Sequence, residues 1–479
     1  MRNWTLAIVV ALFACGGSSS KDIPDAAPPD AAPDAPELPL GDILDELRAI
    51  PGMTVEERTT MIEGYRFFVM DYVQPVDHQN GSGATFKQRL TLLHRDYAAP
   101  VVVQNSGYYV STRGTRSQIA QLTSANQLSM EHRYFLPSRP DPADWSKLTI
   151  AQAAADQHRI IVDLKKRIYK PNKFLTTGAS KGGMTSLFHR RFYPDDVDAT
   201  VAYVAPIDYA SDAVQSPTNR YFIFLENVGT DATCRQKLKD FQNLALSRRA
   251  AMKTRMQAQA SFTQILGEDR ALEFAVEELP FIFWQYGNQS RCANIPANNA
   301  TDDAVFTFLD DTVSVAAYGD QDVLAFLPYY HQSATQLSYP ISDESYLVGL
   351  MYPGQDTAQA YVPAGIPLPA YDGGTSMQDI QSWIASSGTR IMLIYGQNDP
   401  WTAGAATLGA ATDSYKYTAP NGNHGSSLIN MTQADSMAAA ATIRRWAGVT
   451  AAAAPMVKLQ LDPNERTTEQ EEFERRFRR

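Results

Sequence analysis

Alternating apolar and polar positions predict the first elements of the chain. The runs "GYRFFVMDYVQPVD" and "TFKQRLTLLHRDY" alternate partly with period two and flank the turn-rich "HQNGSGA", so they predict an antiparallel pair of strands. The runs "APVVVQNSGYY" and "NQLSMEHRYF" are short and continuous, as in strands buried on both faces. Apolar residues at helical spacing behind Thr149, a suitable N-cap, predict a helix that ends before Pro171.

The later pattern alternates strands with helices and predicts an α/β fold. "KFLTTGAS" and "ATVAYVAP" indicate strands on either side of a helical pattern, "RIMLIYGQNDPW" and "SYKYTAPNGNHGS" indicate two more, and "TQADSMAAAATIRRWAG" indicates a last helix. Residues 213–380 are mostly helical in pattern and interrupt this rhythm. We therefore expect core segments at 41–212 and 381–450, with a helical cap inserted between them at the carboxyl edge of the sheet.

The two ends of the 479-residue chain are not expected to belong to this fold. Residues 1–15 contain a short apolar run that ends in "LFAC", which is similar to the lipobox of bacterial lipoproteins; an ordinary secretory signal is the alternative. The composition of residues 16–40 predicts an extended Pro/Ala/Asp tether, and that of residues 451–479 predicts a charged tail. We expect an extracytoplasmic protein that lipid on Cys15 anchors to a bacterial membrane, or else a secreted or periplasmic one.

Charge and cysteine content narrow the picture further. The net charge of −10 argues against a nucleic-acid partner, because phosphates require clustered lysine and arginine. Beyond the N-terminal run, no segment is long and apolar enough to predict a transmembrane helix. If Cys15 carries lipid, Cys234 and Cys292 remain, an even number in an oxidising compartment, and we predict a disulfide between them. Two buried free thiols are the alternative.

The segment "TTGASKGG" carries the strongest chemical signal. Gly178, Ser180 and Gly182 form a G-x-S-x-G pattern between a predicted strand and a predicted helix. In that context the glycines permit a sharp turn that lifts Ser180 above the sheet as a nucleophile. The turn also leaves the Lys181 backbone N–H at a helix start, where an oxyanion would form. A purely structural Gly/Ser turn is the alternative.

A serine nucleophile needs a histidine base and an acid that orients it. In an α/β-hydrolase the acid and then the histidine follow the serine, and His424 in "PNGNHGSS" fits this order; His331, inside the cap, fits packing better. Asp399 directly follows the strand-like "IMLIYG" and is the favoured acid, with Asp208 as the competitor. The loop after "VVVQN" offers the N–H of Gly107 or Tyr108 as the second oxyanion donor. No metal or cofactor motif is visible.

Several segments together resemble the bacterial secreted tripeptidyl aminopeptidases that prefer proline or small residues. They are "EHRYFLPSRP", "TTGASKGGMTSLFHRRFYPDDVDATVAYVAP", "EELPFIFWQYG", "IYGQNDPW" and "NGNH", and the resemblance covers about residues 62–446. It implies an α/β-hydrolase serine peptidase, distantly similar to lysosomal Pro-Xaa carboxypeptidases and dipeptidyl peptidases. It also implies the roles of nucleophile, acid and base for Ser180, Asp399 and His424, and a cap that admits short peptides.

Residues for substrate binding are less well marked in the sequence. Glu131 in "MEHRYF" could anchor a substrate ammonium, but an ion pair with Arg133 or another cation is the favoured interpretation. Glu277 and Glu278 in the cap are alternative anchors. The aromatic cluster beside them could line a pocket that accepts proline, or could simply be cap core; it comprises Phe281, Phe283, Trp284 and Tyr286.

The prediction is therefore a secreted serine exopeptidase of the tripeptidyl or prolyl aminopeptidase type. It would act on short peptides, particularly those with proline or small residues, and would contact the membrane through its lipid anchor alone. An esterase or lipase of the same fold is the alternative within enzymes, because the same triad cleaves esters. A surface-binding protein that has kept the fold without catalysis is the alternative from another class.

Overall fold

The computed structural model describes residues 41–450 and 467–469. The predicted signal peptide, the tether and most of the charged tail lie outside these residues. The described part contains a sheet in the order β1-β2-β3-β5-β4-β6-β7-β8-β9. Its strands are β1 (Met53–Arg58), β2 (Arg66–Pro75), β3 (Thr85–His94), β4 (Val101–Asn105), β5 (Asn126–Met130), β6 (Phe174–Ala179), β7 (Ala199–Tyr203), β8 (Ile391–Gly396) and β9 (Tyr415–Ala419).

The sheet is antiparallel at one end and parallel through the rest. β1, β2 and β3 pair antiparallel, which confirms the predicted pair β2–β3, and β3 continues antiparallel to β5. From β5 to β9 every neighbouring pair is parallel. Parallel strands need crossover connections, which the helices supply. Their carboxyl ends therefore meet at one edge, where the motif residues of the sequence lie.

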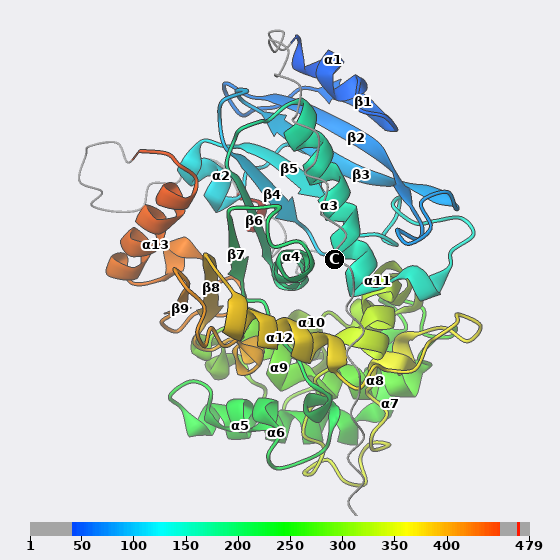
Figure 1. Ribbon diagram of the computed structural model, residues 1–479. Coiled ribbons are helices and arrows are strands. Elements are labelled where there is room, and N and C mark those ends of the chain that lie inside the picture. The colour runs from blue at the N-terminus through cyan, green and yellow to red at the C-terminus, as the bar shows by residue number, and fades with distance from the viewer. Residues whose placement is uncertain (1–40, 451–466, 470–479) are drawn as a thin grey trace, which may run out of the picture. The chain divides into compact units, whose positions relative to one another are not determined.

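Helices cover both faces of the parallel part (Figure 1). Side chains along each parallel strand point alternately to the helices on one face and to those on the other. Met392 and Ile394 of β8 pack in one apolar cluster with α2 (Gln118–Thr123) and α13 (Gln433–Trp446). Ile391 and Leu393 face the other side, in a cluster with α4 (Lys181–Phe192). Burial on both faces explains why these strands appear in the sequence as continuous apolar runs.

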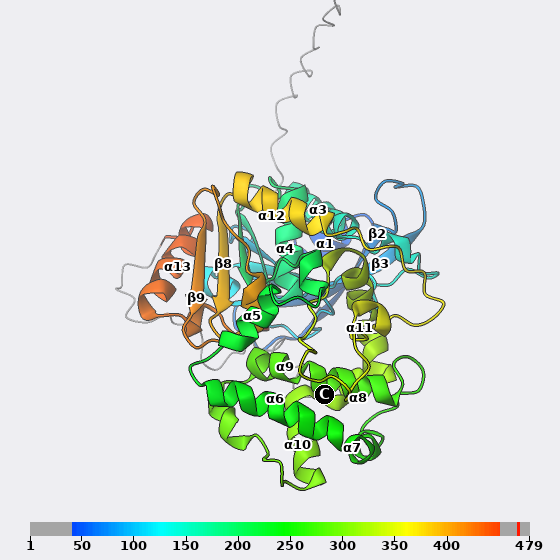
Figure 2. The same ribbon diagram turned by 90° about the horizontal axis from the view of Figure 1, so that it is seen from below.

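The cap lies between β7 and β8, as the break in the α/β rhythm predicts. We call residues 213–374 the cap; Figure 2 shows its helices gathered on one side of the core. Its helices are α5 (Arg220–Asn227), α6 (Ala232–Ser247), α7 (Arg249–Met256), α8 (Glu268–Glu277), α9 (Leu279–Tyr286), α10 (Asp302–Val313) and α11 (Asp320–Gln332). They have an apolar core of their own.

The remaining helices belong to the core. α1 (Ile43–Arg48) and α3 (Ile150–Arg167) join one core cluster, and Thr149 caps α3 by accepting a hydrogen bond from Gln152 N at 3.2 Å, as predicted. α12 (Thr375–Ser387) packs through Ile380 against α4 and the sheet. The cap boundary expected at residue 380 therefore falls inside a core helix, because the helical pattern alone does not say which layer a helix packs on.

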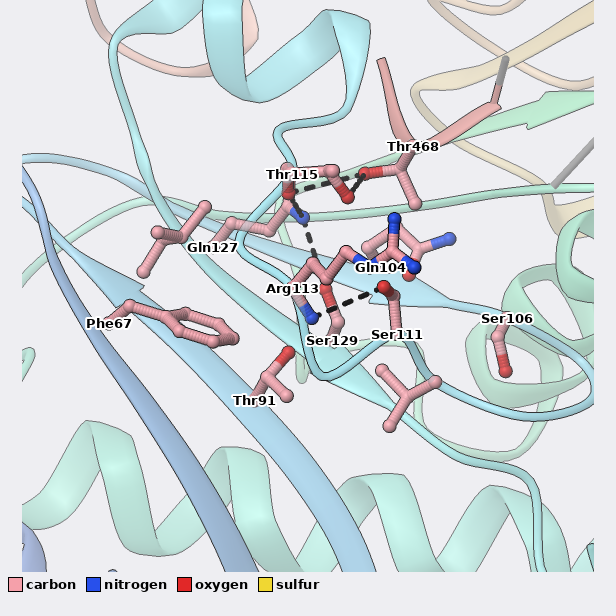
Figure 3. Close-up of a pocket in the computed structure, with 12 residues that line it drawn as sticks. Phe67, Thr91, Gln104, Ser106, Ser111, Arg113, Thr115, Gln127, Ser129 and Thr468 are labelled. Carbon is pink, nitrogen blue, oxygen red and sulfur yellow. Dashed lines mark hydrogen bonds between the residues drawn. The ribbon is translucent and has the colours of Figure 1, made fainter. Parts of the chain in front are cut away.

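The last described residues of the chain contact the core beside a small cavity. Residues 467–469 return to the core: Thr468 Oγ1 hydrogen-bonds Thr115 Oγ1 at 3.2 Å, and the Glu469 carboxylate accepts the Gln118 backbone N–H. Thr468 thereby lines a small cavity beside β3 to β5, drawn in Figure 3, which contains none of the predicted catalytic side chains. Among the described helices, none has the length and apolar character that crossing a membrane requires.

Candidate active site

Ser180 lies at the sharp turn between β6 and α4. Its backbone angles, φ 54° and ψ −127°, are rare for a residue that has a side chain, and its N–H donates to Tyr203 O on the neighbouring strand at 2.9 Å. Such a strained conformation persists only where the surrounding structure holds it, and it is common at functional sites. The turn at Ser180 is therefore the strand-to-helix turn that the G-x-S-x-G pattern predicts.

The two glycines of the motif are required by close backbone contacts. A Cβ on Gly178 would lie 2.4 Å from the carbonyl carbon of Gly182, and a Cβ on Gly182 would lie 2.2 Å from Asn105 O at the end of β4. Any side chain at either position would push the turn away from the sheet. The absence of these side chains lets Ser180 lie directly at the sheet edge.

Asp399 and His424 form a hydrogen-bonded pair at the same edge. Asp399 follows β8 and is fully buried; its Oδ2 lies 2.7 Å from His424 Nδ1, in the loop after β9. Burial raises the pKa of Asp399, whereas the neighbouring charge of His424 lowers it. Oδ1 also accepts the Trp401 backbone N–H at 3.2 Å, which fixes the orientation of the carboxylate.

The other ring nitrogen of His424 is open for chemistry. His424 Nε2 is buried and has no hydrogen-bond partner among the described residues. An unpaired buried nitrogen of this kind is costly in a purely structural histidine. It can accept a proton from a hydroxyl that approaches it, and catalytic hydrogen bonds are often long before substrate binds.

The cap contacts the loop that carries His424. The His424 backbone N–H donates to Gln285 O at 2.8 Å, and Asn423 Nδ2 donates to Tyr286 O at 3.1 Å. The Tyr286 ring lies 6.0 Å from the imidazole and the Trp401 ring 6.2 Å, measured between centroids. The C-terminal end of α9 is therefore part of the immediate surroundings of the imidazole.

The alternative acid and the alternative base have other partners. Asp208 accepts a short hydrogen bond from Tyr221 OH and lies 3.6 Å from Arg220. His331 Nε2 hydrogen-bonds Pro367 O at 3.0 Å, and its ring packs 5.1 Å from Trp145. Of the four residues that the sequence left in competition, only Asp399 and His424 contact each other.

The loop after β4 is held against the turn at Ser180. Gly107 has φ +72°, and a Cβ there would lie 2.5 Å from Gly182 N. The Lys181 side chain, 2 % exposed, donates from Nζ to Gly107 O at 2.9 Å. Burial without a carboxylate partner lowers the pKa of Lys181 well below its usual range. Of the two predicted oxyanion donors, the Tyr108 N–H already donates to Ser106 Oγ at 3.1 Å.

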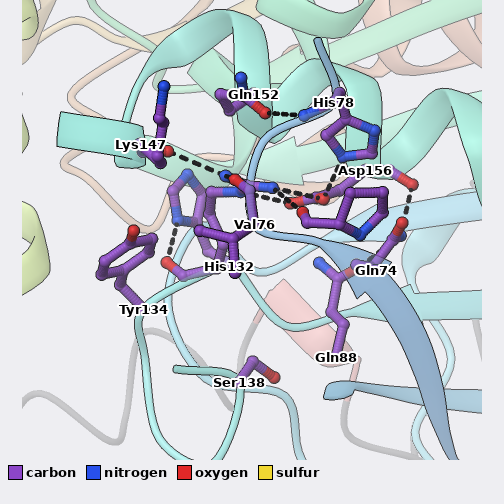
Figure 4. Close-up of polar contacts among 12 residues, drawn as sticks. Gln74, Val76, His78, Gln88, His132, Tyr134, Ser138, Lys147, Gln152 and Asp156 are labelled. Carbon is purple, nitrogen blue, oxygen red and sulfur yellow. Dashed lines mark hydrogen bonds and ion pairs between the residues drawn. The ribbon is translucent and has the colours of Figure 1, made fainter. Parts of the chain in front are cut away.

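Glu131 is fully engaged by its neighbours. Oε1 accepts from Ser138 Oγ at 2.8 Å and Oε2 from Val110 N at 3.1 Å, and burial raises its pKa to about 7. Arg133 pairs with Asp156, at 2.7 Å, rather than with Glu131. Figure 4 shows the surrounding network of Asp156, His78 and Gln74. These contacts tie loops of the core together and leave Glu131 little capacity for a substrate.

The predicted cap residues separate into two groups. Phe283 and Trp284 are buried in the cap core, where the Trp284 ring fills the space beside Gly229, whose Cβ would lie 2.5 Å from it. Phe281 and Tyr286 keep exposed surface on the side of His424. Phe281 also lies 5.0 Å from the Trp401 ring.

Sequence reasoning missed two contributions to this site. Trp401 contacts both Phe281 and His424, and its place two residues after Asp399 was the only signal available. The Lys181 side chain was assigned no role beyond that of its backbone N–H. Its bond to Gly107 depends on how two distant loops pack, which no spacing along the chain reveals.

Comparison with known proteins gives a family model and a relative that match most of the chain. The family model for PS-10 peptidase S37 matches residues 37–475. The prolyl tri/tetrapeptidyl aminopeptidase of Streptomyces mobaraensis is 44 % identical over 421 residues, which cover 86 % of this chain and 86 % of that protein.

Solved structures include two α/β-hydrolase neighbours of low similarity. A proline iminopeptidase from Mycobacterium smegmatis has 11 % identity and a TM-score of 0.35, covering 82 % of this chain and 99 % of its own. The peroxisomal alpha-beta-hydrolase Lpx1 from Saccharomyces cerevisiae has 12 % identity and a TM-score of 0.34, covering 87 % and 97 %. The fold assignment itself rests on the sheet order and the turn at Ser180. The family match across nearly the whole chain and the 44 % identical relative show that the protein is a serine peptidase of the S37 family with an α/β-hydrolase fold.

Proposed function

We propose that the protein is an exopeptidase that releases short peptides through a triad of Ser180, His424 and Asp399. The observation that carries this proposal is the 2.7 Å bond between Asp399 and His424 at the sheet edge where the strained Ser180 also lies. Strand register supports it: Ala179 pairs with Tyr203, and Tyr203 pairs with Ile394 of the strand that leads to Asp399.

The reaction follows from the chemistry of these groups. His424 Nε2 takes the proton of Ser180 Oγ as the oxygen attacks the scissile carbonyl carbon, and Asp399 stabilises the imidazolium that forms. The N–H groups of Lys181 and Gly107 hold the oxyanion. The imidazolium then protonates the leaving amine, the C–N bond breaks, and an acyl-enzyme remains. Water, deprotonated by His424, attacks the ester and frees the peptide acid and Ser180.

The proposed substrates are unfolded peptides with proline or a small residue beside the broken bond. The Streptomyces relative is a prolyl tri/tetrapeptidyl aminopeptidase by name, and 44 % identity supports a related preference here. Phe281, Tyr286 and Trp401 place aromatic surface beside His424. Proline rings pack well on aromatic faces, so we assign these three residues to the proline pocket.

The test uses Ser180→Ala and Asp399→Asn with Ala-Ala-Pro-p-nitroanilide as substrate. Removal of the nucleophile is expected to lower kcat by several orders of magnitude, about 10⁴-fold or more, with the fold intact by circular dichroism. A fluorophosphonate probe should label the wild type and not Ser180→Ala. Near-native turnover by Ser180→Ala would end the proposal. Strong cleavage of p-nitrophenyl esters without amide cleavage would favour an esterase instead.

We also propose that the enzyme acts outside the cytoplasm, tethered through lipid on Cys15. The lipobox-like "LFAC" and the Pro/Ala/Asp segment that follows it support this location. Cys15→Ala should move the protein from the detergent phase to the aqueous phase of a Triton X-114 partition of expressing cells. A wild-type protein already found in the aqueous phase would contradict the anchor.

A further inference from the structure

The N-terminal end of α9 carries a carboxylate held by phenol groups. Glu278 Oε1 accepts hydrogen bonds from Tyr339 OH at 2.7 Å and Tyr361 OH at 3.2 Å, and Oε2 accepts from Tyr318 OH at 2.7 Å. Three donors hold the carboxylate in one orientation and leave it room for at least one more donor. Unlike the buried acids around it, Glu278 keeps exposed surface.

Two more acids, Asp356 and Glu277, lie next to Glu278 in the cap. Asp356 is 2 % exposed and accepts from Tyr361 OH at 3.2 Å; burial and the charges of Glu278 and Glu277 raise its pKa well above the usual range. Glu277 is 1 % exposed and interacts with the Glu344 carboxyl; burial, together with the charge of Glu344, raises the pKa of Glu277 well above its usual range. Within the described chain, no lysine, arginine or histidine forms an ion pair with these three acids; the nearby Arg249 pairs with Glu273.

Without a cation, this arrangement is tolerated because the raised pKa values of Asp356 and Glu277 keep those two acids neutral. Buried carboxylates without a counter-charge lose much of their hydration, and like charges nearby add repulsion. A protein can avoid the cost with apolar side chains, so the retention of several acids in one place calls for an explanation. A cation that arrives with a ligand would offset both the desolvation and the repulsion.

The other end of α9 reaches the reaction centre. Gln285 O accepts the His424 N–H at 2.8 Å, seven residues after Glu278. At about 1.5 Å rise per residue, α9 separates the two points by about 10 Å. An extended peptide advances about 3.3–3.6 Å per residue, so this length corresponds to about three residues.

A series of tyrosine rings also connects the loop after β4 with Glu278. Tyr108, in the loop after β4, lies 6.1 Å from the Tyr329 ring, and Tyr329 lies 5.3 Å from Tyr330. Tyr330 stacks on Tyr361 at 4.1 Å, and Tyr361 bonds Glu278. Rings therefore extend from the predicted oxyanion loop to the acids, and Tyr330 keeps exposed surface although burial raises the pKa of its hydroxyl.

We propose that Glu278 and Asp356 bind the α-ammonium group of the substrate, and that α9 sets its distance from His424 at about three residues. The ligand class is a peptide with a free N-terminus. This proposal rests on the proposed exopeptidase function and names the part of the site that selects the substrate end and the product length. The three tyrosines orient the Glu278 carboxylate, and the ammonium supplies the positive charge that the described residues lack.

A binding measurement tests this proposal without depending on turnover. In the Ser180→Ala background, calorimetry should detect Ala-Ala-Pro-amide with a free amine and much weaker binding of the N-acetyl form. Adding Glu278→Gln, or Asp356→Asn as a second variant, should weaken binding of the free-amine peptide about 10- to 100-fold, as expected for loss of a hydrogen bond to a charged group. The acetylated peptide should bind equally in all variants.

Turnover gives an independent readout with a matched control. For Glu278→Gln, kcat/KM on Ala-Ala-Pro-p-nitroanilide should fall by the same factor, and the preference for three residues over two or four should flatten. Asp303→Asn removes an exposed cap carboxylate, 84 % accessible, and should change neither value. An unchanged ratio of free-amine to acetylated peptide in both Glu278→Gln and Asp356→Asn would overturn the inference. Failure of the triad itself would show instead in the Ser180→Ala turnover assay.

Discussion

Several carboxylic acids in the protein are buried in surroundings that favour their neutral form. Asp208, at 3 % exposure, accepts from Tyr221 OH and has its pKa raised from 3.8 to about 7, chiefly because burial disfavours the charged form. Glu131 and Glu469 are raised to about 7 for the same main reason. Such groups link the free energy of unfolding to pH.

The sign of this linkage for Asp208 is opposite to that of an acid whose pKa is lowered by folding. Between pH 3.8 and about 7, the folded protein retains a proton on Asp208 that the unfolded chain has already released. Its contribution to stability is therefore fully present below pH 3.8 and is lost as the pH rises through about 7, at up to about 1.4 kcal/mol per pH unit. Asp208→Asn, which cannot ionise, should flatten the fall in urea-unfolding free energy between pH 4 and 8.

Asp303→Asn is the control for this measurement, since its carboxylate is 84 % exposed and forms only a surface ion pair with Arg255. It should reproduce the wild-type pH profile. A profile for Asp208→Asn that is parallel to the wild type across the range would show that Asp208 is ionised in the folded protein.

Single residues also mark where sequence reasoning succeeds. Thr149 and the glycines of the Ser180 turn have local roles that motif and spacing reveal, and the structure shows those roles. The orientation of Lys181 and the partners of Glu131 could not be predicted. Both depend on which loops from distant parts of the chain pack against them.

At the scale of elements, the loop after β4 and the N-terminal end of α4 form one packed unit. Gly107 combines a left-handed backbone with a close approach to Gly182, whereas Gly64 has a similar φ of +75° and no atom within 4 Å of its missing Cβ. A comparison of substitutions at these two glycines therefore separates the effect of a left-handed backbone from the effect of steric exclusion.

Substitution of each glycine by alanine tests this unit. Gly107→Ala has to move the loop off the turn, and misplacement of about 1 Å at a reacting centre can cost about 100-fold, so kcat/KM should fall by about that factor. Gly64→Ala should lose about 1 kcal/mol of stability at most and keep full activity. Equal activity in the two variants would show that the loop position does not matter for the reaction.

The predicted strands are confirmed where burial determines the pattern of apolar residues along the sequence. Strands β4, β7 and β8 are buried throughout and β6 in all but its last residue, and their apolar runs identified them. β1 was not predicted, because its residues "MTVEER" are mostly exposed and polar and its pairing with β2 defines it. The expected cap boundary at residue 380 divides α12, because a helical pattern carries no information about the layer on which a helix packs.

For the whole molecule, the disulfide Cys234–Cys292 is the main covalent constraint on the cap among the described residues. It joins α6 to the turn after α9, with a sequence separation of 58, and confirms the predicted pairing. Closing a loop of this length restricts the unfolded chain and is worth about 4 kcal/mol in the loop-entropy model.

Replacement of both cysteines by alanine should therefore lower the unfolding free energy by up to about 4 kcal/mol. Urea unfolding followed by circular dichroism measures the change, and dithiothreitol should destabilise the wild type while leaving Cys234→Ala/Cys292→Ala unaffected. A double variant as stable as the oxidised wild type would show that the cap core alone fixes these segments.

The bonds from Gln285 and Tyr286 to the loop of His424 have a consequence for how substrates arrive. The cap cannot swing away as a lid without breaking the contacts that position the imidazole. We therefore expect a substrate to enter as a chain end while the cap keeps its contacts with the loop of His424. Compact proteins would then be spared by geometry alone, and only frayed termini or ready-made fragments would be degraded.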